Sequence, residues 1–114
     1  MKELSYLKRH LLKGDIIMIG FVVKRSTSEE SICEFLKEHA CVSFEVRGES
    51  GITIEILESF VEVFTRNAHW NGRVSSFDSI DKKLIKDRMN PSEDEMDIIR
   101  KIMRAAGKRY STAA

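Results

Sequence analysis

Residues 52–66, with the sequence ITIEILESFVEVFTR, decide how much of this chain is sheet. Their first half alternates apolar and polar residues, and their second half is rich in residues with strand propensity. The alternation fails at Leu57 and again at 60–61. On a helical wheel, however, the polar residues share one arc of about 120°, as in a surface helix. We therefore predict a helix that ends near 71–72, with a β-meander over 52–66 after the turn at 48–51 as the alternative.

The residues before this stretch predict a strand, a helix and a second strand. Residues 15–24 are rich in Ile and Val, which is typical of a strand buried on both faces. Thr27 and Glu30 match a capping box, so a helix is expected over 28–40, and residues 41–47 alternate like a second strand. If the two strands are neighbours, they can be parallel, with a right-handed crossover. The predicted fold class is α+β, a small sheet containing this unit and covered by several helices.

Helices are also expected at the two ends of the chain. Leucines three and four residues apart predict a helix over 2–13. A short helix should lie between Ile80 and Pro91, because the residue before proline resists the helical conformation. A second capping box opens a helix over 92–107, with Gly107 as its expected C-terminal cap.

Length and composition indicate one globular domain over residues 1–110, with 111–114 as a frayed tail. With 42% hydrophobic residues, 32% charged residues and a net charge of +1, the chain lacks the composition of a disordered protein. Two cysteines are too few for a secreted disulfide scaffold. The longest apolar run, 16–23, is far shorter than the roughly 20 residues of a membrane span, and no signal peptide is recognised. We expect a cytoplasmic protein that does not enter membranes.

The first candidate site for a partner is the segment His69–Trp70–Asn71–Gly72–Arg73, which we expect to form a turn. Tryptophan and arginine are favoured anchors of protein interfaces, so His69, Trp70 and Arg73 are the predicted partner-binding residues. The alternative, which the usual burial of tryptophan favours, is that Trp70 packs on the hydrophobic core.

The second candidate is a basic surface formed by the two ends of the chain. Its residues are Lys8, Arg9, Arg100, Lys101, Arg104, Lys108 and Arg109. The helix macrodipole explains why cations gather at the end of the last helix, but five of them exceed what one helix end requires. If the terminal helices pack side by side, their cations could neutralise nucleic-acid phosphates.

The third candidate is an anion site in the loop formed by Lys24, Arg25, Ser26, Thr27 and Ser28. The loop joins a strand to a helix, where free backbone N–H groups and the helix dipole favour an anion. It lacks the glycines of a phosphate-binding loop, and two glutamates follow it at the positive end of the dipole. Ordinary helix capping is therefore the favoured explanation.

No group of residues has the spacing of a catalytic or metal site. Cys33, His39 and Cys41 lack the short Cys-x2–4-Cys pairs of structural zinc sites. No nucleophile elbow and no isolated carboxylate pair is recognised. We predict no catalytic residues, no metal and no cofactor.

These observations favour a small non-enzymatic regulatory or accessory protein that binds a macromolecular partner and self-associates. Nucleic-acid binding by the basic ends is the alternative function. An enzyme acting on a phosphorylated ligand through the loop at 24–28 has the least support.

Overall fold

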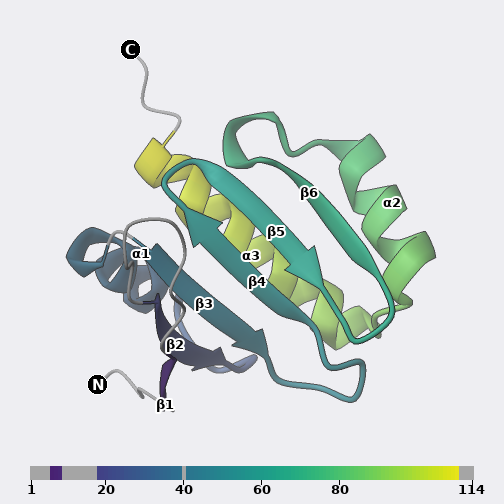
Figure 1. Ribbon diagram of the computed structural model, residues 1–114, viewed down its shortest axis with the longest axis horizontal. Coiled ribbons are helices and arrows are strands. Elements are labelled where there is room, and N and C mark those ends of the chain that lie inside the picture. The colour runs from purple at the N-terminus through teal and green to yellow at the C-terminus, as the bar shows by residue number, and fades with distance from the viewer. Residues whose placement is uncertain (1–5, 9–17, 40, 111–114) are drawn as a thin grey trace.

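Six strands form one mixed sheet in the computed structural model, which describes residues 6–8, 18–39 and 41–110 (Figure 1). The strands lie in the sheet in their order along the chain; β2 and β3 are parallel, and all other neighbours are antiparallel. They are β1 (Tyr6–Lys8), β2 (Met18–Val23), β3 (Cys41–Val46), β4 (Thr53–Leu57), β5 (Phe60–Phe64) and β6 (His69–Arg73). The helices are α1 (Glu29–Glu38), the 3-10 turn η1 (Val74–Ser76), α2 (Ser79–Met89) and α3 (Glu93–Tyr110). The protein is a small α+β domain, as predicted.

The strand–helix–strand unit is confirmed. β2, α1 and β3 lie within the predicted ranges 15–24, 28–40 and 41–47, and β2 and β3 are adjacent and parallel. Ile32, Phe35 and Leu36 of α1 face the core. The rings of Phe21 and Phe35 stack with their centroids 4.9 Å apart, which joins β2 to α1.

The segment 52–66 is a pair of strands, so the predicted helix is wrong and the meander is correct. Leu57 pairs with Phe60 across a two-residue turn that begins at Glu58. The residues that face the core are fully buried, namely Ile54, Ile56, Val61 and Val63. The turn moves the inward positions from even to odd residue numbers, and this is the reason why the alternation breaks in the sequence. β6 continues the meander where a helix end was expected, at 71–72.

The predicted N-terminal helix is also wrong where the structure describes it. Tyr6–Lys8 form β1, in which Lys8 lies opposite Met18 of β2. Pairing with a neighbouring strand, a tertiary interaction, overrides the helical spacing of the leucines. The rest of 2–13 and the tail 111–114 lie outside the described residues.

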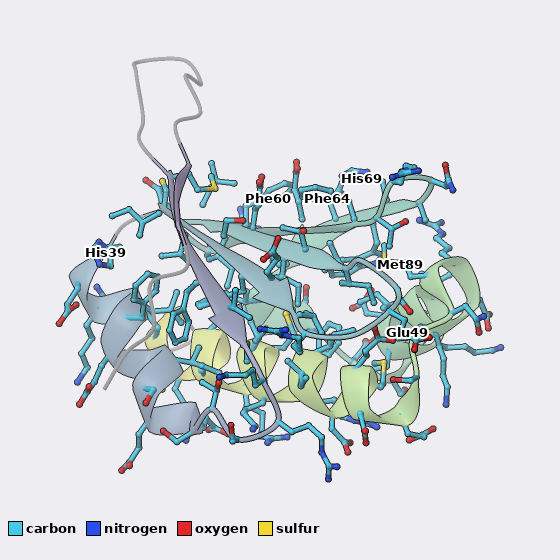
Figure 2. All side chains as sticks on the ribbon, turned by 90° about the horizontal axis from the view of Figure 1, so that it is seen from below. His39, Glu49, Phe60, Phe64, His69 and Met89 are labelled. Carbon is cyan, nitrogen blue, oxygen red and sulfur yellow. The ribbon has the colours of Figure 1, made fainter. Side chains whose placement is uncertain are left out.

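The helices cover one side of the sheet (Figure 2). α1 and α3 pack against each other, and α2 packs beside β6. α3 is the largest contributor to this layer, and its buried residues are Met96, Ile98, Ile99, Ile102, Met103, Ala105 and Ala106. Within the described ranges, no helix has both the length and the apolar character that crossing a bilayer requires.

The helix caps follow the predictions in part. The capping box of α3 is present: Glu95 N–H donates to Ser92 Oγ, and Ser92 N–H donates to Glu95 Oε1. The cap of α1 is one residue later than predicted, because Ser28 accepts from Ser31 N–H. Gly107 is not a C-terminal cap, since α3 continues to Tyr110. The short helix between Ile80 and Pro91 is confirmed as α2.

Candidate partner-binding surface

The side of the β4–β6 meander that points away from the helices is the open face of the molecule. Strand geometry places Phe60, Glu62 and Phe64 of β5 on this face, because alternate residues of a strand point to the same side. Their neighbours in sequence, Val61 and Val63, face the core and are fully buried. Figure 2 shows Phe60, Phe64 and His69 on the side of the sheet opposite the helices.

The strand register arranges the open face in three rows. One row is Leu57, Phe60 and Arg73; the middle row is Glu55, Glu62 and Asn71; the third is Thr53, Phe64 and His69. The central position of the open face is thus a carboxylate, Glu62. Phenylalanines flank it along its own strand, and the carboxylate of Glu55 lies opposite it on β4.

Phe60 is exposed to a degree that is unusual for a large apolar side chain. It is 41% exposed, and Ile80 of α2 is the other large hydrophobic residue that is exposed among those described. Phe64 on the same face is partly exposed. Two aromatic side chains on one strand, on a sheet side that the helices leave uncovered, are the kind of apolar surface that marks an interaction site.

A pocket with a volume of ≈ 450 Å³ opens on this face, at its Phe64 side. It is lined by Glu55, Glu62, Phe64 and residues 65–69. The turn from β5 to β6 is held by Thr65, whose Oγ1 accepts hydrogen bonds from the N–H groups of Asn67 and Ala68. His69 Nε2 lies 3.8 Å from Glu62 Oε1. The pocket therefore combines two carboxylates, an aromatic wall and a fixed turn.

Towards β3 the same side of the sheet becomes buried and remains polar. Ser43 lies opposite Glu55 in the register and is fully buried. Within the described part of the chain, the Ser43 hydroxyl has no hydrogen-bond partner. Cys41 is buried on this side too, and burial, with the nearby charge of Glu58, raises the pKa of its thiol. A thiol of this kind is poorly reactive.

The outer edge of β6 is protected against pairing with another strand. Ladder alternation turns the backbone groups of His69, Asn71 and Arg73 outwards, because Val74 N–H bonds to Ser59 O on the β5 side. The outward carbonyl of His69 accepts from Arg88, and that of Arg73 accepts from the Ser76 hydroxyl. Capped edges discourage strand addition. A partner has better access to the open face than to this edge.

The predicted partner site at 69–73 is a strand and not a turn, and the strand separates its residues. Trp70 faces the core, is 5% exposed and contacts Phe77 edge to face with ring centroids 6.0 Å apart. The ring leaves room for no side chain at Gly72, because a Cβ there would lie 2.9 Å from it. His69 and Arg73 lie on the open face, where Arg73 donates a hydrogen bond to Ser59.

The basic residues of α3 are engaged within the molecule. Arg104 Nε and Lys108 Nζ bind the two carboxylate oxygens of Glu29 at 3.0 and 2.6 Å, and Arg100 lies 3.4 Å from Asp97. The hydrogen bond from Lys108 lowers the pKa of Glu29 against the effect of burial. The two contacts with Glu29 tie α3 to α1, whereas the pair of Arg100 and Asp97 lies within α3.

The basic surface was made conditional on the two ends of the chain packing side by side, and the described residues do not meet this condition. Lys8 lies in β1, which is apart from the last turns of α3 in both views (Figures 1 and 2). Arg9 lies outside the described residues. Arg109, near the end of α3, also has an interaction within the chain.

The loop at 24–28, the candidate anion site for which helix capping was the favoured explanation, makes polar contacts within the chain. Lys101 Nζ donates to the carbonyls of Arg25 and Thr27 at 2.9 and 2.7 Å. The Thr27 hydroxyl accepts from Lys24 N–H, and Ser28 caps α1, while Ser26 lies in the intervening turn. Arg25 pairs with Asp94 at 3.5 Å. These contacts are those of a helix-capping loop.

A groove of ≈ 870 Å³ borders this loop at the carboxyl ends of β2 and β3. Its charges are of both signs: Lys24, Arg25 and Arg47 face Glu49, Asp94 and Glu95. Glu95 is 2% exposed and accepts hydrogen bonds from Ser92 N–H and from the N–H and hydroxyl of Ser50, all within 2.8 Å. Burial acts to raise the pKa of Glu95, but these hydrogen bonds outweigh it and lower the pKa. The groove is thus braced by a structural carboxylate.

Sequence reasoning missed the residues that make the open face. Phe60, Glu62 and Phe64 were assigned to a helix, although the alternation in FVEVF was the signal for a strand with one aromatic and acidic side. Over the part of the chain that the structure describes, no group of three or more His, Cys, Asp or Glu side chains could hold a metal ion. No protein-family model matches the chain, and no curated protein or solved structure is significantly similar to it.

Proposed function

We propose that this chain is a small non-enzymatic regulatory or accessory protein that binds a protein partner through the open face. The observation that carries the proposal is the exposure of Phe60 on a sheet face that the helices leave uncovered. Burying apolar area contributes about 25 cal/mol per Å², so a partner that covers this face gains affinity from it. A second copy of the chain is the first partner to consider, because two-fold dimers are the commonest assemblies.

The other two candidate functions have weaker support. Cations of α3 that could contact nucleic acid already bind Glu29, Asp97 and loop carbonyls. In the loop at 24–28, the Ser28 hydroxyl caps α1 and the Thr27 hydroxyl accepts from Lys24 N–H. Both cysteines are free thiols, which supports the proposal that the protein works in a reducing compartment such as the cytoplasm.

A selection of random 12-residue peptides against the immobilised protein tests the proposed function. Selected peptides should bind the native protein and lose at least tenfold in affinity with Phe60→Thr, a residue that keeps strand propensity. Ile80→Thr is the matched control, since Ile80 is also exposed but lies on α2. Peptides that bind both variants equally, or a failure to select any, would refute the open face as a binding site. Light scattering of the native protein and Phe60→Thr decides separately whether a second copy is a partner.

A further inference from the structure

The open face has a chemical character that narrows the choice of partner. Along β5, Glu62 stands between Phe60 and Phe64 on the same side, roughly 6.8 Å from each along the strand. A cation between Glu62 and one of these phenylalanines lies within about 6 Å of its ring, the range in which rings attract ammonium and guanidinium groups.

Glu55 adds a second negative charge at the same place. It lies directly opposite Glu62 on β4, and carboxylates in such a pair repel each other. Glu55 is 8% exposed and lines the pocket together with Glu62 and Phe64. A positive group between the two carboxylates would turn this repulsion into attraction on both sides.

The pocket has room for such a group and lies at one end of the face. Its ≈ 450 Å³ falls in the range of about 300–1,000 Å³ found for ligand pockets. One cation of the chain, Arg66, lines the pocket from the exposed β5–β6 turn, where it stands against the two carboxylates Glu55 and Glu62. Arg73 belongs to the other row, beside Phe60, where it bonds to Ser59 Oγ at 3.1 Å. The Phe64 side of the open face thus carries two carboxylates against one guanidinium group.

We infer that the partner is a protein segment with an arginine or lysine next to apolar residues. Its cationic side chain enters the pocket, packs on the ring of Phe64 and pairs with Glu62 and Glu55. Its apolar residues cover Phe60. This inference rests on the proposed function, and it specifies the chemistry of the partner.

The same charges argue against nucleic acid on this face. Proteins that bind single strands combine stacking aromatic side chains with a positively charged groove. Here the aromatic residues flank carboxylates, which repel phosphates.

The peptides selected in the preceding experiment test the inference. We expect arginine or lysine at one position in most of them, next to apolar residues. Binding of a selected peptide, measured by calorimetry in 0.05 M salt, should weaken at least tenfold with Glu62→Gln and be abolished with Glu62→Lys. Glu45→Gln is the matched control, because Glu45 is an exposed carboxylate on the same side of the sheet, on β3. The affinity should also fall as salt is raised to 0.5 M.

The outcomes separate this inference from the proposed function. Peptides without a cation, whose binding is lost with Phe60→Thr but kept with Glu62→Gln, would overturn the inference and support the proposed function. Peptides unaffected by Phe60→Thr would overturn both. Binding of a fluorescent single-stranded oligonucleotide that is lost with Phe60→Thr would also overturn the inference. Urea unfolding of each variant establishes that it is folded, and Glu62→Asp, which keeps the charge, should recover part of the lost affinity.

Discussion

The two sides of β5 differ in the size and exposure of their side chains, although both are formed by the same five residues. Val61 and Val63 face the helices and are fully buried, whereas Phe60, Glu62 and Phe64 face away, and Phe60 is 41% exposed. The larger apolar side chains thus lie on the side that contributes less to the core. Because burial of apolar area is what stabilises a domain, Phe60 and Phe64 contribute less to stability here than they would on the core side.

The comparison also holds for polar groups. On the helix side, Glu95 is buried and accepts three hydrogen bonds, of which the two from Ser50 link α3 to the β3–β4 turn. On the other side, the buried Ser43 hydroxyl has no partner among the described residues. Buried polar groups in proteins are nearly always hydrogen-bonded. The buried carboxylate on the helix side is thus paired by the fold itself, whereas the buried hydroxyl on the other side is not paired within the described residues.

The largest effect should come from the helix side. Ile56→Ala removes a fully buried side chain and leaves a cavity, so the free energy of unfolding should fall by about 2–5 kcal/mol. Urea unfolding followed by circular dichroism measures the loss. A change below about 1 kcal/mol would contradict the assignment of this side as the core.

How much of the fold could be predicted from the sequence differs between segments. The unit formed by β2, α1 and β3 was predicted because β2 is a continuous run rich in Ile and Val, while α1 and β3 keep clear periods of 3.6 and 2. The hairpin of β4 and β5 was not, because its two-residue turn changes the parity of the apolar positions and imitates a helical arc. A pattern read across a turn mixes two strands, and only pairing in the sheet separates them.

The candidate site was harder to predict than the fold. Aromatic and basic residue types pointed to Trp70 and the end of α3, but composition does not tell which side of an element faces solvent. Trp70 points inwards because β6 alternates in phase with Val63 opposite it. The cations of α3 meet Glu29, which is 75 residues earlier than Arg104 in the chain. Such contacts between distant segments follow from topology and are not encoded in local spacing.

Glu95→Gln should give the second largest effect. Hydrogen bonds to a charged group contribute about 1.5–3 kcal/mol, and the amide of glutamine would place donors against the donors of Ser50 and Ser92. We expect a loss of about 2 kcal/mol at pH 7, whereas Glu49→Gln, an exposed neighbour, should change little.

The effect of Glu95→Gln should depend on pH with a definite sign. The pKa of Glu95 is lowered in the folded protein, so its contribution is complete above the pKa of the unfolded chain and is lost as pH falls through the folded pKa. The difference in unfolding free energy between native protein and Glu95→Gln should therefore shrink from pH 7 towards acid. A difference that stays constant or grows would show that the charge of Glu95 is not what stabilises the turn.

Removal of side-chain atoms should destabilise the protein less on the open face than in the core. Phe60→Thr removes more atoms than Ile56→Ala, yet Phe60 is partly exposed, so we expect a loss of no more than about 1 kcal/mol. Urea unfolding of the two variants, side by side, measures the contrast. If Phe60→Thr cost as much as Ile56→Ala, the open face would be a second core and not a binding surface.

The smallest effect on stability should come from the β4–β5 turn, which sets which residues of β5 face the core and which lie on the open face. Glu58 begins the β4–β5 turn with φ 59°, a left-handed conformation that costs about 1–2 kcal/mol for a residue with a side chain. Glycine removes this cost but loses about 0.5–1 kcal/mol through the entropy of the unfolded chain. Glu58→Gly should therefore stabilise the protein by roughly 0.5 kcal/mol, because the relief of backbone strain exceeds the loss of entropy. A slip of one residue in the pairing of β4 and β5 would exchange the two sides of β5. The sign of the change in unfolding free energy therefore tests whether this turn sets the register. A stabilised variant that still binds the selected peptides keeps the register Leu57–Phe60, whereas a destabilised one would mean that the turn does not fix the open face.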